Sequence, residues 1–424
     1  MKEEDYIQLK YKPIGNDLVC LFRVEPAAGI SMKKACANVA LESSVGTWTS
    51  VGTEKNYMKK LAAKVFSIKH IDSKNAFVKI AYPSALFEKG NAPNILSSIA
   101  GNIFGMKIVK NLRLEDIQIP KSIVNSFHGP KYGVDGIRKF MKVKDRPFLG
   151  TIVKPKLGLN AKDHAKVAYE AWVGGCDFVK DDENLSSQDF NKFEERLTRT
   201  LEMADKAKSI RGEEKAYFVN VTAETREMIK RAELVEQQGG KYVMIDILTE
   251  GFGALQTLRE ADFNLAIHGH RAMHAAFTRN KKHGISMMTI ADISRLIGID
   301  SLHIGTGIGK LEGSIKEIKE IEEEIESKKV KELKDRLSQD WGKIKPTIAV
   351  SSGGLQPLHI PFLIKHLGKD LVIQMGGGLH GNKLGTTKGA LSARQAIEAS
   401  IKGIPLKEYA KDHLELKSTL EQWG

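Results

Sequence analysis

The feature that most constrains this chain is a series of eight short apolar runs that follow one another after residue 145. The runs are FLGTIVKP, CDFVKD, AYFVNVT, KYVMIDI, FNLAIHG, SLHIGTG, TIAVSSGG and LVIQMGGG. The stretches between them, such as AKDHAKVAYEAWVGG and TREMIKRAELVEQQGG, are amphipathic and end in paired glycines, as helix C-termini often do. Alternating strands and helices predict a parallel sheet, and eight consecutive units favour a closed (β/α)8 barrel over an open doubly wound sheet.

Residues that carry chemistry follow these runs directly, which supports the barrel. They are Lys154, Lys180, His270, His303, Ser352 and Gly376. In a (β/α)8 barrel the C-terminal ends of all the strands meet on one face, and the active site is built there. We therefore expect these residues to lie close together.

The part of the chain before the barrel has a different sequence pattern. DLVCLFRVEP and NAFVKIAYP are typical of strands, and SMKKACANVALES is typical of a helix with one apolar stripe. We therefore predict a smaller α+β domain over residues 1–125 and a catalytic barrel domain with C-terminal helices over residues 126–424. Within the second domain, SIKEIKEIEEEIESKKVKELKDRL is expected to be a charged helix that faces solvent.

Composition excludes several classes of protein. The chain has 424 residues and no apolar run of the roughly 18 residues that a membrane helix needs. Its first residues, MKEEDYIQLKYKP, have no apolar segment of the signal-peptide type, and three scattered cysteines argue against a disulfide framework. We expect a cytoplasmic protein. The net charge of +13 is spread along the chain without a helix-turn-helix or an aromatic-studded basic patch, so it favours steering of anionic substrates over nucleic-acid binding.

The sequence KDDE after CDFV combines a lysine with carboxylates. Side chains alternate along a strand, so Lys180 and Asp182 are expected to face the same way, and Glu183 can turn inward from the loop. Two carboxylates suit a hard cation such as Mg2+. The lysine fits such a site only if its neutral amine reacts with CO2, because the resulting carbamate is an anionic oxygen ligand. The alternative is a surface acidic turn in which the lysine is an ion-pair partner.

Two other basic segments follow strands. Lys154 and Lys156 come after FLGTIV, with Thr151 just before them, and two lysines at this spacing are expected to face one cavity. A desolvated lysine beside another cation has a lowered pKa and can act as a base; the alternative is an ordinary basic loop. The sequence HGHRAMH brings His268, His270, Arg271 and His274 together, which offers acid–base groups and phosphate-binding charge, although some of these histidines are expected to be structural.

Glycine-rich turns complete the pattern. GTGIGKLEG carries Lys310 between glycines, which suits a mobile lid or a simple flexible turn. SSGG and GGG follow the last two apolar runs, where barrels often bind phosphate through backbone N–H groups.

Together these segments resemble the large subunit of ribulose-1,5-bisphosphate carboxylase/oxygenase, nearly from end to end. The motifs that carry the resemblance are GTIVKPKLGL, GGCDFVKDDEN, HGHRAMHAAF, HIGTGIGKLEG, SSGG and QMGGG, with ESSVGTWT and GNIFGMK in the first domain. The resemblance implies a carboxylase that adds CO2, or O2 in a side reaction, to ribulose-1,5-bisphosphate through an Mg-bound enediolate, giving two 3-phosphoglycerate.

The resemblance also implies a role for each matching residue. Lys180 would carry the CO2 carbamate and bind Mg2+ with Asp182 and Glu183. Lys154 would be the base, Lys156 would assist it, His270 would act near the reacting carbons, and Lys310 would stabilise the new carboxylate. The substrate would be held by Thr151, by Arg271, His303 and Ser352 around one phosphate, and by Gly354, Gly376 and Gly377 with Thr47 and Trp48 around the other. Glu42 and Asn102 would reach the site from a partner subunit.

The implied assembly is a homodimer or an oligomer of dimers, with no small subunit. The short C-terminus after HLELKSTLEQWG is more like the archaeal-type form III or II/III chains than the plant type, which implies a role in salvage of nucleotide-derived ribose phosphates. Gln356 departs from the histidine that such chains often have in this position. The alternative is a non-carboxylating homologue, an enolase or isomerase of a phosphorylated keto compound. Such relatives lose several of these residues, which are all present here.

Overall fold

The computed structural model describes residues 3–47, 49, 51–309 and 313–424. The chain divides into two compact units. The first, which we call the sheet unit, comprises Met1–Gly129, Met273–Ile297 and Ser327–Ile344. The second, the barrel unit, comprises Pro130–Ala272, Gly298–Glu326 and Lys345–Gly424. No helix among the described residues is long and apolar enough to span a membrane.

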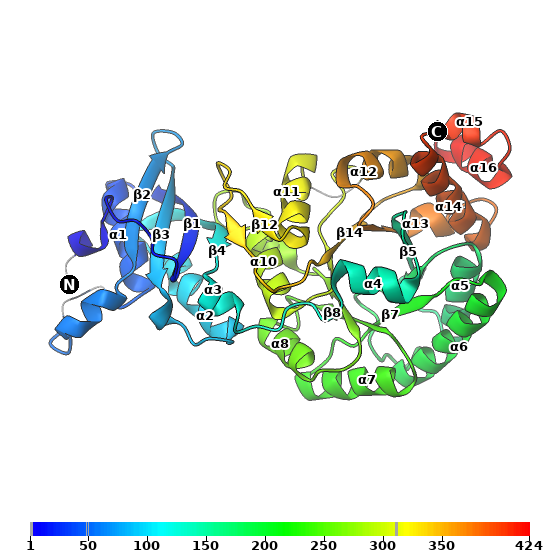
Figure 1. Cartoon of the computed structure of the whole chain (residues 1–424), viewed down its shortest axis with the longest axis horizontal. Coiled ribbons are helices and arrows are strands. Elements are labelled where there is room, and N and C mark those ends of the chain that lie inside the picture. The colour runs from blue at the N-terminus through cyan, green and yellow to red at the C-terminus, as the bar shows by residue number, and fades with distance from the viewer. Residues whose placement is uncertain (1–2, 48, 50, 310–312) are drawn as a thin grey trace. The chain divides into compact units, whose positions relative to one another are not determined.

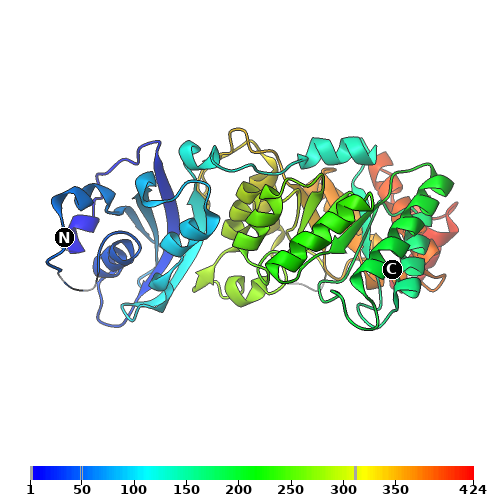
Figure 2. The ribbon, with the colours of Figure 1, turned by 90° about the horizontal axis from the view of Figure 1, so that it is seen from below.

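The sheet unit is built on a five-stranded sheet with the order β10-β4-β1-β3-β2 (blue and cyan for β1 to β4 in Figures 1 and 2). Its strands are β1 (Asp17–Pro26), β2 (Lys64–His70), β3 (Ala76–Pro83), β4 (Val109–Gln118) and β10 (Gly284–Ile285), and a separate pair is formed by β12 (Lys329–Val330) and β13 (Gln339–Asp340). Its α-helices are α1 (Met32–Glu42), α2 (Ala92–Ile99), α3 (Lys121–Val124), α9 (His274–Thr278) and α10 (Met287–Ile297). The 3-10 helix η4 (Asn102–Gly105) lies in the same unit. Ser31 caps α1 by accepting a hydrogen bond from the Lys34 N–H, as N-cap serines do.

The barrel unit contains a closed eight-stranded barrel, which confirms the predicted fold class. Its parallel strands, in order round the barrel, are β5 (Phe148–Ile152), β6 (Phe178–Lys180), β7 (Ala216–Asn220), β8 (Tyr242–Asp246), β9 (Ala266–His270), β11 (Ser301–His303), β14 (Ile348–Ser352) and β15 (Leu371–Met375). Seven of the strands lie within one of the eight apolar runs, and β9 extends one residue beyond its run, to His270. The strands are buried on both faces, which is why they read as continuous apolar runs.

Helices surround the barrel strands on the outside, and α5, α6 and α7 follow one another round it in Figure 1. The helices of this unit are α4 (Gly133–Met141), α5 (Ala161–Val173), α6 (Phe193–Arg211), α7 (Thr225–Gln237), α8 (Phe252–Glu260), α11 (Ile315–Glu326), α12 (Ile360–Leu367), α13 (Gly377–His380), α14 (Thr386–Lys402), α15 (Leu406–Tyr409) and α16 (Leu414–Trp423). Local sequence sets several boundaries. Asn160 caps the start of α5 through its side chain, and Gly212 ends α6 in the left-handed conformation.

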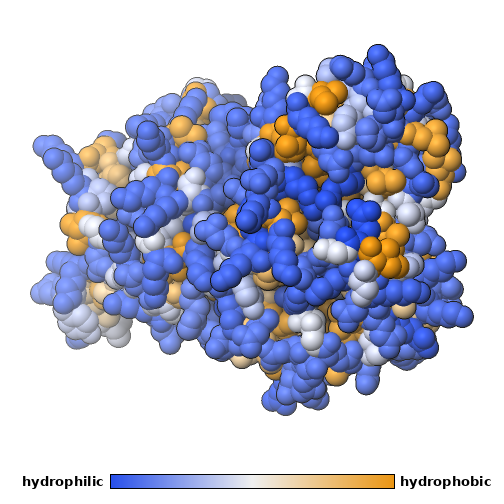
Figure 3. Space-filling view, turned by 45° about the vertical axis from the view of Figure 1, so that its right-hand side comes forward, coloured by the Kyte–Doolittle hydropathy of each residue, from blue (hydrophilic) through white to orange (hydrophobic). Residues whose placement is uncertain are grey.

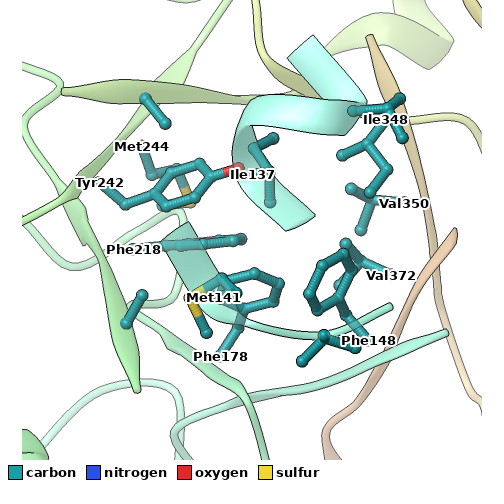
Figure 4. Close-up of a cluster of buried hydrophobic side chains, with 14 residues drawn as sticks. Ile137, Met141, Phe148, Phe178, Phe218, Tyr242, Met244, Ile348, Val350 and Val372 are labelled. Atoms are coloured by element: carbon teal, nitrogen blue, oxygen red, sulfur yellow. The ribbon is translucent and has the colours of Figure 1, made fainter. Parts of the chain in front are cut away.

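The core of the barrel is a cluster of buried side chains at the N-terminal ends of its strands (Figure 4). Phe178, Phe218 and Tyr242 contact one another edge-on or tilted, and Ile137 and Met141 of α4 lie in the same cluster. Because inward-facing residues alternate along a strand, β6 carries Phe178 in this core and Lys180 two residues later towards the C-terminal face.

The predicted charged helix over residues 314–337 is only partly correct. The helix α11 ends at Glu326, and the following residues form the short strand β12, which pairs with β13. The apolar stripe of α11 is buried at Ile318, Ile321 and Ile325, so this helix covers the barrel with one face. Elsewhere, on the face of the molecule shown in Figure 3, apolar residues lie in small groups among hydrophilic side chains.

Candidate active site

Lys180 is a deeply buried charged group at the C-terminal end of the barrel strands. It is the last residue of β6, and its side chain is 1% exposed. Its ammonium donates hydrogen bonds to the Asp181 carbonyl at 2.7 Å and to Met244 Sδ at 3.4 Å, and lies 4.0 Å from Glu183 Oε2. Burial lowers the pKa of Lys180, although the nearby carboxylates of Glu183 and Asp182 oppose the shift. A larger share of neutral amine is therefore available than on an exposed lysine.

Asp182 joins two strand ends. Its carboxylate is buried and accepts a 2.7 Å hydrogen bond from the Lys154 ammonium, which extends from the end of β5. Lys156 donates a hydrogen bond to Asn184 Oδ1 at 3.1 Å, two residues after Asp182 in the loop that follows β6. The two lysines thus lie on one side, as their spacing predicts, with Lys154 half-buried and Lys156 exposed.

Asp181, between the two expected ligands, points the other way. Its carboxylate accepts hydrogen bonds from Arg196, from the Asn220 N–H and from the Tyr217 hydroxyl. Burial would raise the pKa of Asp181, but Arg196 and His164 outweigh it and hold that pKa at about 2. These contacts fix the backbone on either side, so Lys180 and Asp182 are held on the inner face of the barrel.

His270, the last residue of β9, lies beside the same carboxylates. Its Nδ1 is 2.9 Å from Asp246 Oδ1, and its Nε2 is 3.6 Å from Glu183 Oε2. Its ring contacts the ring of His303 edge-on, with centroids 4.8 Å apart. Asp246, which contacts His270, was not identified from the sequence, although it lies next to the end of the fourth apolar run and is the last residue of β8.

His268 is the structural histidine that the HGHRAMH segment predicts. It is fully buried, its Nδ1 lies 2.9 Å from Ser301 Oγ, and its ring packs between those of Phe218 and His303. Burial lowers the pKa of both His268 and His303 well below its ordinary value, so both rings are uncharged. The barrel therefore holds neutral imidazoles at the end of β11 and within β9.

Arg271 follows β9 and is also buried. One of its terminal nitrogens donates to the Ile304 carbonyl at 3.1 Å, at the end of β11. Burial lowers the pKa of this guanidinium to about 10, which leaves it charged at neutral pH. Arg271 and His303 thus lie at two adjacent strand ends, where an anionic group can be bound by charge and by hydrogen bonds together.

The glycine turns lie at the ends of β14 and β15. Gly354 has a φ of 70°, which favours glycine, and it follows Ser352 at the end of β14. Gly376 lies against the Lys154 side chain: a Cβ added to Gly376 would be 3.0 Å from Lys154 Cε. Gly376 therefore leaves room for the Lys154 side chain, which would have to shift slightly to accommodate a Cβ.

His380, at the end of α13, is a second residue that sequence reasoning missed. Its Nε2 lies 2.9 Å from Thr151 Oγ1 and 3.0 Å from the Ile152 carbonyl, and its Nδ1 lies 3.2 Å from Thr386 Oγ1. A histidine five residues after Met375 was the available signal, but nothing local to it indicates that it contacts β5.

The remaining predicted residues belong to the sheet unit or lie outside the described residues. Glu42 ends α1, Asn102 is exposed at the start of η4, and α1 contacts η4. Thr47 lines a small cavity of about 140 Å³ with residues such as Tyr6. Trp48 and Lys310 lie outside the described residues.

The chemistry of this site combines lysines with carboxylates. Among the residues that the structure describes, no three His, Cys, Asp or Glu side chains converge as a metal-binding group. Asp182 and Glu183 provide oxygen donors of the kind that Mg2+ prefers, and the Lys180 amine, whose pKa is lowered by burial, lies 4.0 Å from Glu183 Oε2. The carboxylates present therefore fit Mg2+, and Lys180 would supply a third anionic ligand only if it were modified.

Comparison with known proteins agrees with this arrangement. Residues 5–123 match the family model for the N-terminal domain of the ribulose bisphosphate carboxylase large chain, and residues 133–423 match the model for its catalytic domain. The ribulose bisphosphate carboxylase of Methanocaldococcus jannaschii is 52% identical over 99% of this chain and 100% of that protein. The protein of the same name from Methanosarcina mazei is 50% identical over 99% of each chain.

Solved structures give the same result. A dimeric archaeal Rubisco from Hyperthermus butylicus has a TM-score of 0.95 and 45% identity, and covers 100% of this chain and 99% of its own. An octameric Rubisco from Pyrococcus horikoshii has a TM-score of 0.93 and 44% identity, over 100% of this chain and 97% of its own. These relatives are archaeal, in agreement with the predicted archaeal-type group. The chain therefore belongs to the ribulose bisphosphate carboxylase large chain family and is an enzyme of the carboxylase, or lyase, class.

Proposed function

We propose that this carboxylase adds CO2 and water to ribulose-1,5-bisphosphate and releases two molecules of 3-phosphoglycerate, with O2 as a competing substrate. The observation that carries the proposal is the buried amine of Lys180 beside Asp182 and Glu183 at the C-terminal end of the barrel. The similarity of the chain to proteins named ribulose bisphosphate carboxylase supports the same proposal.

Lys180 is proposed to react with CO2 before catalysis. Its neutral amine would add to CO2 to give a carbamate and release one proton, which turns a cation into an anionic oxygen donor. The carbamate would hold Mg2+ together with Asp182 and Glu183. Mg2+ bound there would supply the positive charge that stabilises an enediolate. The lowered pKa of Lys180 supports this step, because only the neutral amine attacks CO2.

Lys154 is proposed to take the C3 proton of the substrate. Its nitrogen lies 2.7 Å from Asp182 Oδ2, so in the neutral form, which alone can accept a proton, it would be within reach of a group bound next to that carboxylate. Lys156 would assist from the same loop, and His270 would act near the reacting carbons. Lys310 would stabilise the carboxylate that forms when CO2 adds.

The two phosphates are proposed to bind on two different sides of the C-terminal face of the barrel. Arg271 and His303 would hold one phosphate, with Ser352 on the neighbouring sugar hydroxyl, and the buried guanidinium of Arg271 supports this role. The residues proposed around the other phosphate and the adjoining hydroxyls are Gly354, Gly376, Gly377, Thr47, Trp48 and Thr151.

The active assembly is proposed to be a homodimer or an oligomer of dimers, in which Glu42 and Asn102 complete the partner subunit's site. The dimeric and octameric archaeal Rubiscos to which the chain is similar support this. We also propose that the enzyme serves the salvage of nucleotide-derived ribose phosphates, in line with its archaeal-type sequence.

The test is incorporation of labelled bicarbonate from ribulose-1,5-bisphosphate and Mg2+. Labelled 3-phosphoglycerate is expected from the native chain and not from Lys154→Ala. An unlabelled, isomerised sugar bisphosphate would instead identify the chain as the enolase or isomerase alternative. No product from a chain that is folded and supplied with CO2 and Mg2+ would contradict both.

A further inference from the structure

His380 uses both ring nitrogens to connect segments that are far apart in the sequence. Nε2 contacts the end of β5 through Thr151 Oγ1 and the Ile152 carbonyl, which are 229 and 228 residues away. Nδ1 contacts Thr386 at the start of α14. A surface histidine would not be constrained in this way.

The hydrogen bonds determine which nitrogen carries the proton. The Ile152 carbonyl can only accept, so Nε2 must be the N–H donor. The Thr151 hydroxyl donates to the Met375 carbonyl at 2.6 Å, so Thr151 Oγ1 is free to accept from the same Nε2–H. In the neutral ring Nδ1 is then the acceptor, and the Thr386 hydroxyl donates to it.

These bonds hold two parts of the proposed site against each other. Thr151 is three residues before Lys154, and Met375 immediately precedes the Gly376 turn. The Lys154 side chain passes close to Gly376, where a Cβ would be 3.0 Å from Lys154 Cε. A small movement of β5 relative to α13 would therefore alter the distance between the lysine and the turn.

We propose that His380 is a positioning residue, which keeps Lys154 and the glycine turn at Gly376 and Gly377 in register through its Nε2–H bonds to the end of β5. The inference rests on the proposed function, because it assumes that Lys154 takes a proton and that the turn binds a phosphate.

The state of the ring agrees with a positioning role. Burial lowers the pKa of His380 to about 4, partly offset by its bond to the Ile152 carbonyl, and Lys154 lowers it further. The ring is therefore uncharged at neutral pH and adds no second positive charge beside Lys154.

The test compares His380→Leu, His380→Gln and Thr386→Val with the native chain. Leucine fills the space without a donor, glutamine keeps an N–H that can reach the Ile152 carbonyl, and valine removes the hydroxyl that donates to Nδ1. His413→Leu is the matched control, because His413 also bonds a backbone carbonyl, that of Tyr409, in the same unit but outside the proposed site. The readouts are exchange of the C3 proton of ribulose-1,5-bisphosphate with solvent, kcat, KM and Tm.

For His380→Leu we expect a roughly 10- to 100-fold loss of kcat/KM, with slower C3 proton exchange and a higher KM for the bisphosphate. His380→Gln should recover most of that loss, and Thr386→Val should show a smaller loss in the same direction. His413→Leu should change Tm alone. Selective ¹⁵N labelling should show His380 protonated on Nε2.

A purely structural role would be shown if His380→Leu, measured well below its Tm, kept native proton exchange and KM. If His380→Leu does not fold, glutamine decides: the proposal is wrong if His380→Gln folds and loses proton exchange as badly as Lys154→Ala. If the native chain exchanges the proton without fixing CO2, the proposed function fails, yet the exchange rates still test His380.

Discussion

Lys154 and Asp182 form a 2.7 Å ion pair that joins the end of β5 to the loop after β6. The carboxylate is 3% exposed, whereas the ammonium is 33% exposed. The buried member of the pair is the proposed magnesium ligand, and the more accessible member is the proposed base. Under these proposed roles, the same carboxylate would influence both metal binding and proton transfer.

The first prediction concerns the metal ligands. Asp182→Asn and Glu183→Gln each remove one negative charge, so Mg2+ binding should weaken and carboxylation should fall by at least about 100-fold at ordinary Mg2+. Circular dichroism should show an unchanged fold. Asp189→Asn is the control, because Asp189 is fully exposed and pairs with Lys192, outside the proposed site. Full activity of either ligand variant would refute the assignment.

The second prediction concerns activation by CO2. Preincubation with bicarbonate and Mg2+ should raise the initial rate, and activation should be faster at alkaline pH because it requires neutral Lys180. Lys180→Arg keeps the positive charge but should be inactive at any CO2 concentration. Lys215→Arg is the control, since Lys215 is also buried but bonds the Cys176 carbonyl and Glu213. Mass spectrometry of native enzyme trapped with bound CO2 should detect the adduct on Lys180. If the native enzyme shows no lag and the Lys180→Arg variant is still active, the carbamate is excluded.

The third prediction concerns assembly. If Glu42 acts in the partner subunit's site, Glu42→Gln and Lys154→Ala chains should each be inactive alone. Mixed dimers would contain one site with both native residues, so mixing should restore up to about one quarter of native activity with random exchange. Native mass spectrometry should verify that subunits exchange. Exchange without recovery would show that each site is built within one chain.

The fourth prediction concerns stability and pH. The pKa of His380 is about 4 in the folded chain, against an ordinary value of 6.5. As pH falls through 6.5 the unfolded ring binds a proton before the folded ring does, so His380 lowers stability progressively until about pH 4, and has no such effect above 6.5. The size is ~2 kcal/mol at pH 5.

Urea unfolding of the native chain and His380→Leu at about pH 7 and about pH 5 measures this difference. The native chain should lose more free energy of unfolding than the variant over that interval. Equal losses in both proteins would mean that His380 has an ordinary pKa in the folded state.

The barrel could be predicted from the sequence because its signal is local. A parallel strand covered by helices is apolar on both faces, so β5 and β15 appear as largely apolar runs, and polar residues follow at each strand end. Lys154 and Lys180 could be identified for the same reason. The division at residue 125 and the role of each site residue stay predictions.

The contacts that orient these residues could not be predicted. Asp246 reaches His270 across neighbouring strands, and His380 reaches Thr151 from the opposite end of the barrel sequence. Both depend on which strands become adjacent when the barrel closes. The end of α11 at Glu326 was missed because the charged pattern continues beyond it, while the chain turns into β12.

The aromatic cluster of Phe148, Phe178, Phe218 and Tyr242, with α4 packed against it, fills the barrel axis below the strand ends that carry Lys154 and Lys180. Under the proposed function, substrates and products would therefore enter and leave the site through the C-terminal face alone. A bound product would then block the entry of the next sugar bisphosphate, and product release would become one of the steps that limit turnover.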